Sequence, residues 1–155
     1  MCFSIFKLFR QGGATGEIPS PYIDLLQDGV KFIPAMNVVT IEPVKSPVWL
    51  TTVQDTNSME PLIDAGHTVI LSGDPELLDK VAVGNVIVWV KPNGNSRIHS
   101  IIEIKEDKDG WFCQTQGLNC AHPDPERIRR ADIKWVALGV IWTRANEEQH
   151  YNINE

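Results

Sequence analysis

Three residues of this sequence have side chains that could together carry out nucleophilic catalysis: Ser58, His99 and Asp124. A serine hydroxyl is a weak nucleophile until a base removes its proton. An imidazole suits that role because it ordinarily titrates near neutral pH, and a carboxylate usually orients its second ring nitrogen. These residue types predict acyl-transfer chemistry, provided that the fold brings the three side chains into contact.

Two of these residues also have a purely structural interpretation. His99 lies in the strand-like segment R-I-H-S-I-I-E-I at 97–104, where a half-buried imidazole with one hydrogen-bond partner is common. Asp124 directly precedes Pro125, which is typical of a helix N-cap followed by proline at the first helical position. The residue types alone leave both interpretations open.

Ser58 belongs to the segment D-T-N-S-M-E-P-L at 55–62, between two apolar, strand-like stretches. In an exposed turn its hydroxyl would reach a substrate carbonyl, and nearby backbone N–H groups, including its own, could stabilise an oxyanion. Met59 is apolar and adaptable, and Pro61 restricts the backbone just after the serine. We therefore expect Met59 and Pro61 to be substrate-binding residues.

The elements that must position these residues are mainly β-strands. Val, Ile, Thr and Trp are concentrated in short runs bounded by Gly, Pro, Asn and Asp. The predicted strands are Asn37–Ile41, Val48–Val53, His67–Leu71, Val86–Val90, Arg97–Ile104, Trp111–Thr115 and Trp135–Trp142. Glycine-containing segments at 92–95 and 107–110 predict hairpin turns. Helical turns are expected at Pro75–Asp79 and Pro125–Arg130, so the fold class is mainly antiparallel β with a few short helical turns.

Within the predicted strand at 97–104 the side chains alternate between two faces. One face carries Arg97, His99, Ile101 and Glu103, and the other carries Ile98, Ser100, Ile102 and Ile104.

The length of 155 residues favours one compact domain. We expect a tail and linker over residues 1–20, a β domain over 21–145 and a C-terminal tail over 146–155. The segment at 11–20 is rich in Gly and small residues, and Ser20 with Pro21 predicts a helical turn through Leu26. The first ten residues, M-C-F-S-I-F-K-L-F-R, predict either a short amphipathic anchor in a membrane surface or a tail that docks on the domain.

The net charge of −6 and the scattered basic residues disfavour nucleic-acid binding. Three cysteines are too few for a disulfide scaffold, and we interpret them as reduced thiols in a cytosol-like compartment. Cys113, Cys120 and His122 with Asp124 match no strong zinc spacing, so no metal or other cofactor is expected. No stretch approaches the roughly 20 apolar residues that span a bilayer, which predicts a protein that is soluble or peripheral to a membrane.

Several segments resemble the signal peptidase family, in the order in which that family has them. N-S-M-E-P-L-I-D-A-G-H-T-V-I-L at 57–71 is similar to its nucleophile box, S-M-x-P followed by G-D-x-V. G-N-V-I-V at 84–88 resembles its G-D-I-V-V strand, and the segment at 97–104 resembles the strand that carries its general base. A-L-G-V-I-W at 137–142 resembles its last strand. The similarity covers about residues 48 to 143.

The base distinguishes branches of this family, because bacterial signal peptidases and LexA-type self-cleaving repressors use lysine. His99 makes the chain similar to the archaeal and endoplasmic-reticulum types, which use serine and histidine. Carried over, Ser58 is the nucleophile, His99 the general base and Asp124 the residue that orients it. The box K-G-D-N-N stands here as Q-G-L-N-C, so Leu118 replaces the family's first acid. Two further family aspartates are replaced at turn positions, by His67 and Asn85.

The resemblance implies a coiled antiparallel β-sheet of the signal-peptidase/LexA-like type. It also implies a serine endopeptidase that cleaves a polypeptide after a site with small residues at the first and third positions before the cut. Two alternatives remain open. One is a self-cleaving regulator, with the linker G-G-A-T-G as a candidate site. The other is a non-catalytic peptide-binding module on the same fold.

Overall fold

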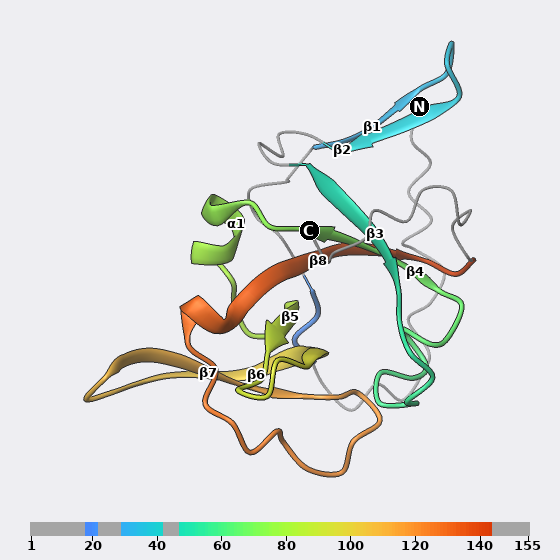
Figure 1. Ribbon diagram of the computed structural model, residues 1–155. Coiled ribbons are helices and arrows are strands. Elements are labelled where there is room, and N and C mark those ends of the chain that lie inside the picture. Colours follow the sequence, from blue (N-terminus) through green and yellow to red (C-terminus); the bar gives the residue numbers. More distant parts are fainter. Residues whose placement is uncertain (1–17, 22–28, 42–46, 144–155) are drawn as a thin grey trace.

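The computed structural model describes residues 18–21, 29–41 and 47–143. Strands predominate among the regular elements of this part (Figure 1). The strands are β1 (Val30–Ile33), β2 (Val38–Ile41), β3 (Val48–Thr52), β4 (Thr68–Ser72), β5 (Val86–Val90), β6 (Ser96–Asp107), β7 (Gly110–Gln116) and β8 (Ile133–Ile141). One short helix, α1 (Pro75–Asp79), and a 3₁₀ turn at Arg130–Asp132 complete the regular elements of the described part. This part of the chain is therefore mainly β, as predicted.

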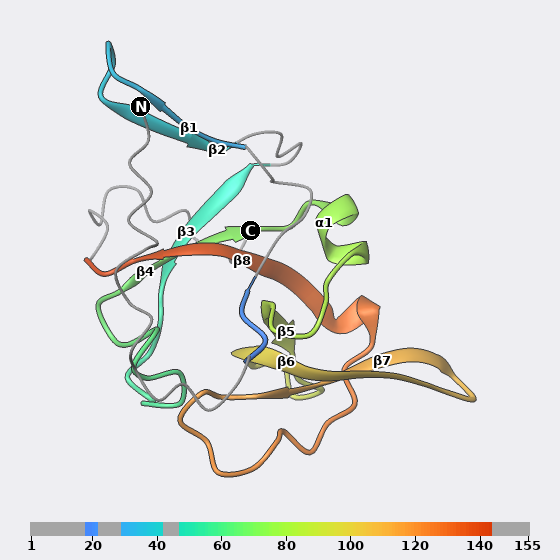
Figure 2. The same cartoon turned by 180° about the vertical axis from the view of Figure 1, so that it is seen from behind.

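Six strands form one sheet in the order β3-β4-β8-β5-β6-β7, with every neighbouring pair antiparallel. β1 and β2 form a separate hairpin at one end of the molecule (Figures 1 and 2). β8 lies between β4 and β5, so it joins β3 and β4, the two strands that flank the Ser58 turn, to the half of the sheet that carries His99.

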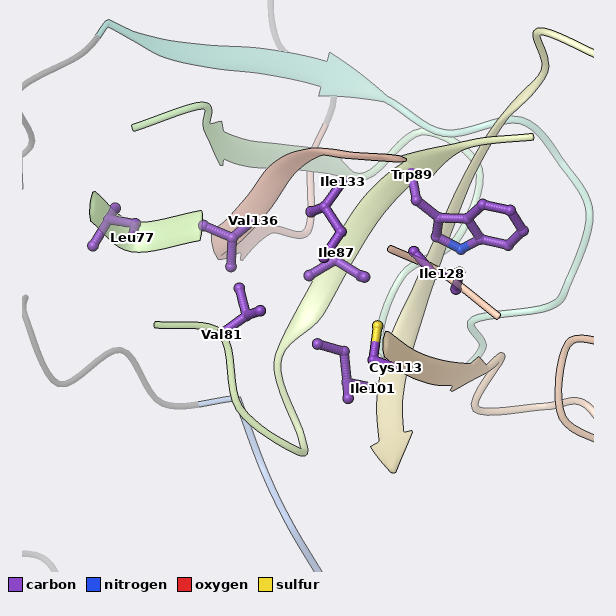
Figure 3. Packing of buried hydrophobic residues seen from close by; sticks show 9 residues of the cluster. All are labelled: Leu77, Val81, Ile87, Trp89, Ile101, Cys113, Ile128, Ile133 and Val136. Atoms are coloured by element: carbon purple, nitrogen blue, oxygen red, sulfur yellow. The ribbon is translucent and has the colours of Figure 1, made fainter. Parts of the chain in front are cut away.

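The core packs on both faces of β5, whose first four residues are buried. Ile87 and Trp89 belong to one cluster, with Ile101, Ile128 and Val136 among its other members (Figure 3). Val86 and Val88 belong to a second cluster on the alternate side chains of the same strand. A strand covered on both faces reads as a continuous apolar run, which the sequence V-I-V-W-V shows.

Most strand predictions are confirmed to within a few residues, and so is the helix at Pro75–Asp79. The side chain of Asp74 caps that helix by accepting from the Glu76 N–H at 3.0 Å. Both hairpin turns place a glycine at positive φ, Gly94 at 84° and Gly110 at 94°. β1 is missing from the prediction because its four residues pair only with β2 and are all exposed, so no burial pattern marks them.

The helical turn predicted at Pro125–Arg130 is wrong. Ile128 instead pairs with Cys113 as an isolated β-bridge, with reciprocal backbone hydrogen bonds of 2.9 and 3.0 Å. Ile128 is 1 % exposed and packs in the first core cluster. Burial and pairing of this residue outweigh the local preference of Asp-Pro for a helix start. The 3₁₀ turn begins only at Arg130.

The face assignment within β6 holds only for its first half. The register with β7 shifts between Ile101 and Glu103, and such a bulge reverses the side chains that follow. Ile102 is therefore 39 % exposed, and Ile104 packs against the same cluster as Ile101. Arg97 and His99 lie before the bulge and share one face, as predicted.

Several predictions fall outside the described residues: the anchor or tail at 1–10, the linker at 11–17, the helical turn over 22–26 and the C-terminal tail at 146–155. No helix in the described part of the chain has the length and apolar character needed to cross a membrane.

Candidate active site

Ser58 lies in the turn region that connects β3 to β4. Asn57 has a positive φ of 58°, a conformation that asparagine tolerates better than most residues. The Glu60 N–H donates to the Asn57 carbonyl at 3.4 Å, and the Leu62 and Ile63 N–H groups donate to the Met59 carbonyl. These bonds close a tight turn with Ser58 at its start.

His99 is the residue that links the Ser58 turn to the rest of the site. Its ring is 4 % exposed, and β6 pairs it with Ile87 of the central strand. Nε2 lies 3.2 Å from Ser58 Oγ, and Nδ1 lies 2.6 Å from Asp124 Oδ2. A neutral ring protonated at Nδ1 would donate to the carboxylate and present Nε2 as an acceptor to the serine.

Asp124 follows β7 in a loop and is 5 % exposed. Its N–H donates to the Thr115 carbonyl at 2.8 Å, and the Thr115 hydroxyl donates to Oδ2 at 2.6 Å. Arg97 Nη1 donates to the other oxygen, Oδ1. Burial opposes ionisation of this carboxyl group, but the hydrogen bonds from His99 and Thr115, the charge of His99 and the hydrogen bond from Arg97 outweigh it. They lower the pKa of Asp124 to about 2.

The three sequence-predicted residues therefore form a continuous chain of contacts from hydroxyl to imidazole to carboxylate. Asp124 uses its side chain within this chain, and no helix begins at Pro125 for it to cap. A second hydroxyl, Thr56 Oγ1, lies 3.2 Å from Ser58 Oγ. The order of contacts is the one that activates a serine: a base beside the hydroxyl and an orienting acid behind the base.

A turn after β7 packs directly against the Ser58 turn. The Asn119 N–H donates to the Ser58 carbonyl at 3.0 Å, and Asn119 Nδ2 donates to the Asn57 carbonyl at 3.0 Å. Gly117 allows this approach: a Cβ there would lie 2.5 Å from the Ser58 carbonyl oxygen and 2.9 Å from His99 Nε2. The absence of a side chain at this position keeps the serine and the histidine in contact.

An open groove of about 910 Å³ runs past Ser58 and His99. One wall comes from the end of β3 and the segment after it, and the other from the β5–β6 hairpin and the loop that carries Asp124. The wall residues include Thr51, Thr52, Val53, Gln54, Lys91, Asn93, Asn95, Ser96, Arg97, Cys120 and His122. A groove of this shape and size can hold several residues of an extended peptide.

The structure does not place the two expected substrate-binding residues on this groove. Met59 is 3 % exposed and packs in the second core cluster, because the turn directs it inward toward Val69 and Leu71. Pro61 is exposed and follows a cis peptide bond, but it is not part of the groove lining. These residues shape the turn rather than the groove wall.

His67 and Asn85, which stand where the sequence resemblance would have aspartates, have structural roles that fit their positions. His67 Nδ1 accepts from the Asp64 N–H at 3.0 Å, and Asn85 Oδ1 accepts from the Ala82 N–H at 2.8 Å. Both side chains thus supply the acceptor that an aspartate would supply in a turn. Leu118, which stands where the sequence resemblance would have an acid, is 49 % exposed and lies outside the groove lining.

Cys113, Cys120 and His122 do not gather into one cluster. Cys113 is buried, which raises the pKa of its thiol to about 12, while Cys120 and His122 line the groove. Among the described residues no group of three His, Cys, Asp or Glu side chains is placed to hold a metal ion.

Sequence reasoning missed four residues that hold the site together: Arg97, Thr115, Gly117 and Asn119. The alternation of β6 did place Arg97 on the same face as His99, and that was the available signal. Nothing in the sequence indicated that Thr115 and Asn119 would reach Asp124 and the Ser58 turn, because those contacts depend on tertiary packing.

Comparison of the chain with protein-family models, with curated proteins and with solved structures finds no match.

Proposed function

We propose that this protein is a serine endopeptidase in which Ser58 is the nucleophile, His99 the general base and Asp124 the residue that orients His99. The observation that carries the proposal is the unbroken chain of contacts, 3.2 Å from Ser58 Oγ to His99 Nε2 and 2.6 Å from His99 Nδ1 to Asp124 Oδ2. Burying a carboxylate and an imidazole costs free energy, and packing of the core alone would require neither group. Here both are buried in a line that ends at a serine in an open groove.

The proposed reaction proceeds through an acyl-enzyme. Ser58 Oγ attacks the scissile carbonyl carbon while its proton passes to His99 Nε2. The tetrahedral intermediate collapses as the imidazolium returns that proton to the leaving amine, and the C–N bond breaks. Water then attacks the ester, again with His99 as base, and releases the acid product and free Ser58. Asp124, with its pKa lowered to about 2, stays ionised and stabilises the imidazolium in both steps.

Two donors near Ser58 are suited to stabilise the oxyanion of each tetrahedral intermediate. One is the backbone N–H of Ser58, in the turn that follows the positive φ of Asn57. The other is the Thr56 hydroxyl, 3.2 Å from Ser58 Oγ. Oxyanion donors of this kind typically contribute about 2.7–4 kcal/mol to the transition state.

The groove favours a polypeptide substrate in an extended conformation. β3 is an edge strand of the six-stranded sheet, and its last residues form one groove wall. An extended peptide could add to such an edge through main-chain hydrogen bonds, with side-chain specificity set by the opposite wall. The resemblance to signal peptidases supports small residues at the first and third positions before the cut, and it supports a fold of the signal-peptidase/LexA-like type.

The test combines an active-site probe with cleavage analysis. A fluorophosphonate should label the wild-type protein on Ser58, as located by mass spectrometry, and should not label Ser58→Ala. Ser96→Ala is the matched control, because Ser96 lines the same groove without contacting His99 in the structure. Labelling that persists in Ser58→Ala would contradict the assignment of the nucleophile.

The same proteins, incubated with a pool of peptides that contain Ala-x-Ala sites, separate the remaining candidates. Cuts in the pool that need Ser58 support the endopeptidase. Ser58-dependent loss of the protein's own first residues, with an untouched pool, supports the self-cleaving regulator. Binding of peptides with neither labelling nor cleavage would establish a peptide-binding module instead.

A further inference from the structure

Arg97 and His99 bind different oxygens of the Asp124 carboxylate. Oδ2 accepts from His99 Nδ1 and from the Thr115 hydroxyl, each at 2.6 Å. Oδ1 is paired with Arg97 Nη1 and has no other hydrogen-bond partner among the residues that the structure describes. With Asp124 only 5 % exposed, little solvent reaches the carboxylate, so removal of Arg97 would leave Oδ1 poorly compensated.

Arg97 is itself held against a rigid part of the core. β6 pairs it with Trp89 of β5, and its guanidinium carbon lies 6.0 Å from the centroid of the Trp89 ring. Trp89 is 1 % exposed and belongs to the first core cluster. The Arg97 side chain, 32 % exposed, therefore runs from a fixed ring to the carboxylate along the groove wall.

A carboxylate that is held through one oxygen only can lose its function in two ways. It can rotate about its Cβ–Cγ bond, which would turn Oδ2 away from His99, or it can take up a proton at the free oxygen. A guanidinium on Oδ1 opposes both, since a charge-assisted bond fixes the orientation and favours the ionised form. A neutral or rotated acid would no longer hold the imidazole in its productive tautomer.

We infer that Arg97 is a positioning residue that fixes the orientation and the charge of Asp124 and, through Asp124, the ring of His99. This inference rests on the proposed function of Ser58 and His99. It extends the chain of contacts to four residues, two of which, Arg97 and His99, stand on one face of a single strand. This role of Arg97 also explains why the chain can have leucine at position 118. A cation, rather than a second carboxylate, completes the environment of Asp124.

The test uses p-nitrophenyl acetate as the substrate and compares Arg97→Ala, Arg97→Lys and Lys91→Ala. Lys91 is the matched control: it lines the same groove and lies 5.9 Å from the same Trp89 ring, but it pairs with Glu126 at 3.4 Å rather than with Asp124. We expect Arg97→Ala to lower kcat by roughly 10²-fold, the loss typical of a misplaced catalytic group. Arg97→Lys should retain part of the kcat that Arg97→Ala loses, and millimolar guanidinium should partly restore the kcat of Arg97→Ala. Guanidinium should not raise the rate of Lys91→Ala.

A second readout needs no catalysis. The proton shared between His99 Nδ1 and Asp124 should give a downfield resonance in the NMR spectrum of the resting protein. We expect Arg97→Ala to shift or broaden that resonance and Lys91→Ala to preserve it. An unchanged resonance together with a wild-type kcat in Arg97→Ala would overturn the inference. If the wild-type protein reacts with neither ester nor fluorophosphonate, the proposed function fails, and the dependence of the His99 resonance on Arg97 alone decides the role of Arg97.

Discussion

The backbone N–H of Asn119 donates a hydrogen bond of 3.0 Å to the carbonyl oxygen of Ser58. The side chain of Asn119 donates a second bond, also of 3.0 Å, to the carbonyl of Asn57. One residue of the turn after β7 therefore donates hydrogen bonds to two consecutive carbonyls of the Ser58 turn. The position of Ser58 relative to His99 depends on this junction as much as on the turn's own hydrogen bonds.

Asn119→Ala should loosen the junction, because it removes the bond to Asn57 and keeps the backbone bond to Ser58. We expect a loss of about 1 kcal/mol in the free energy of unfolding, the typical value for one hydrogen bond. The rate of fluorophosphonate labelling should fall more than this stability loss explains, since the serine would be displaced. Asn93→Ala, an exposed change on the groove rim, provides the comparison for both urea unfolding and labelling. Equal labelling rates in the two variants would contradict the prediction.

Gly117→Ala should disrupt the site more severely. Its Cβ would meet the Ser58 carbonyl oxygen at 2.5 Å, Cys120 Sγ at 2.7 Å and His99 Nε2 at 2.9 Å. Overpacking of this kind costs typically about 1–3 kcal/mol, and relief requires Ser58 and His99 to separate. Gly139→Ala is the matched control, because the nearest atom to its Cβ would lie at 3.9 Å. Thermal unfolding and labelling measured on both variants would show whether the loss is specific to Gly117.

The lowered pKa of Asp124 predicts how stability depends on pH. Its folded pKa is about 2, against an ordinary value of 3.8, so folding favours the ionised form. The stabilisation is fully present above about pH 4 and is lost as the pH falls toward 2. The difference in unfolding free energy between wild type and Asp124→Asn should therefore be largest near neutral pH and shrink below about pH 4. Urea unfolding across this range tests it, and a difference that does not change with pH would contradict it.

Asp107 separates an effect on stability from an effect on Ser58. Its pKa is also lowered to about 2, chiefly by the hydrogen bond from Arg129, yet it stands at the end of β6 away from the groove. Asp107→Asn should leave labelling of Ser58 unchanged, whereas Asp124→Asn should reduce it.

Leu118→Asp introduces the acid that the resemblance to signal peptidases would place at this position, and we expect it to leave the labelling rate of Ser58 unchanged. The Leu118 side chain is 49 % exposed and lies outside the groove lining, so a carboxylate there would face solvent. The comparison is Asp124→Asn, which removes the acid in contact with His99. A rate increase in Leu118→Asp would show that the turn after β7 can bring position 118 to the histidine.

The two described cysteines should differ in their reaction with iodoacetamide. Burial raises the pKa of Cys113 to about 12, so its reactive thiolate is scarce at neutral pH. Cys120 is partly exposed, lines the groove and has its Sγ 3.9 Å from the Ser58 carbonyl. Alkylation should therefore occur at Cys120 before Cys113, as peptide mapping can show, and should slow labelling of Ser58. Labelling of Cys120→Ala should be insensitive to the reagent.

The strands that carry the site were predictable from the sequence because their local patterns and their burial agree. V-I-V-W-V forms β5 at the bounds predicted for it, and the turn glycines have positive φ as expected. The region after β7 was not predictable in the same way. Asp124-Pro125 has the local chemistry of a helix start. The conformation of this segment is instead determined by the pairing of Ile128 with Cys113 and by the hydrogen bonds of Asp124 with His99 and Arg97.

The same contrast applies within the site. Ser58, His99 and Asp124 could be nominated because their residue types imply chemistry, and the structure brings them together. Met59 could not be assigned correctly from residue type, since an apolar side chain in a turn can point either into a groove or into the core. In this structure the Met59 side chain packs in the core cluster with Val69 and Leu71.

The three residues of the proposed relay come from a turn before β4, from β6 and from a loop after β7. During synthesis on the ribosome, Ser58 emerges long before Asp124 and before β8, which joins the two halves of the sheet. Non-local strand pairing of this kind forms late, because the intervening chain must first be ordered. In the proposed mechanism, a nascent or truncated chain that ends before residue 124 would therefore carry an inert serine, and the order of translation would delay the proposed cleavage until the sheet is complete.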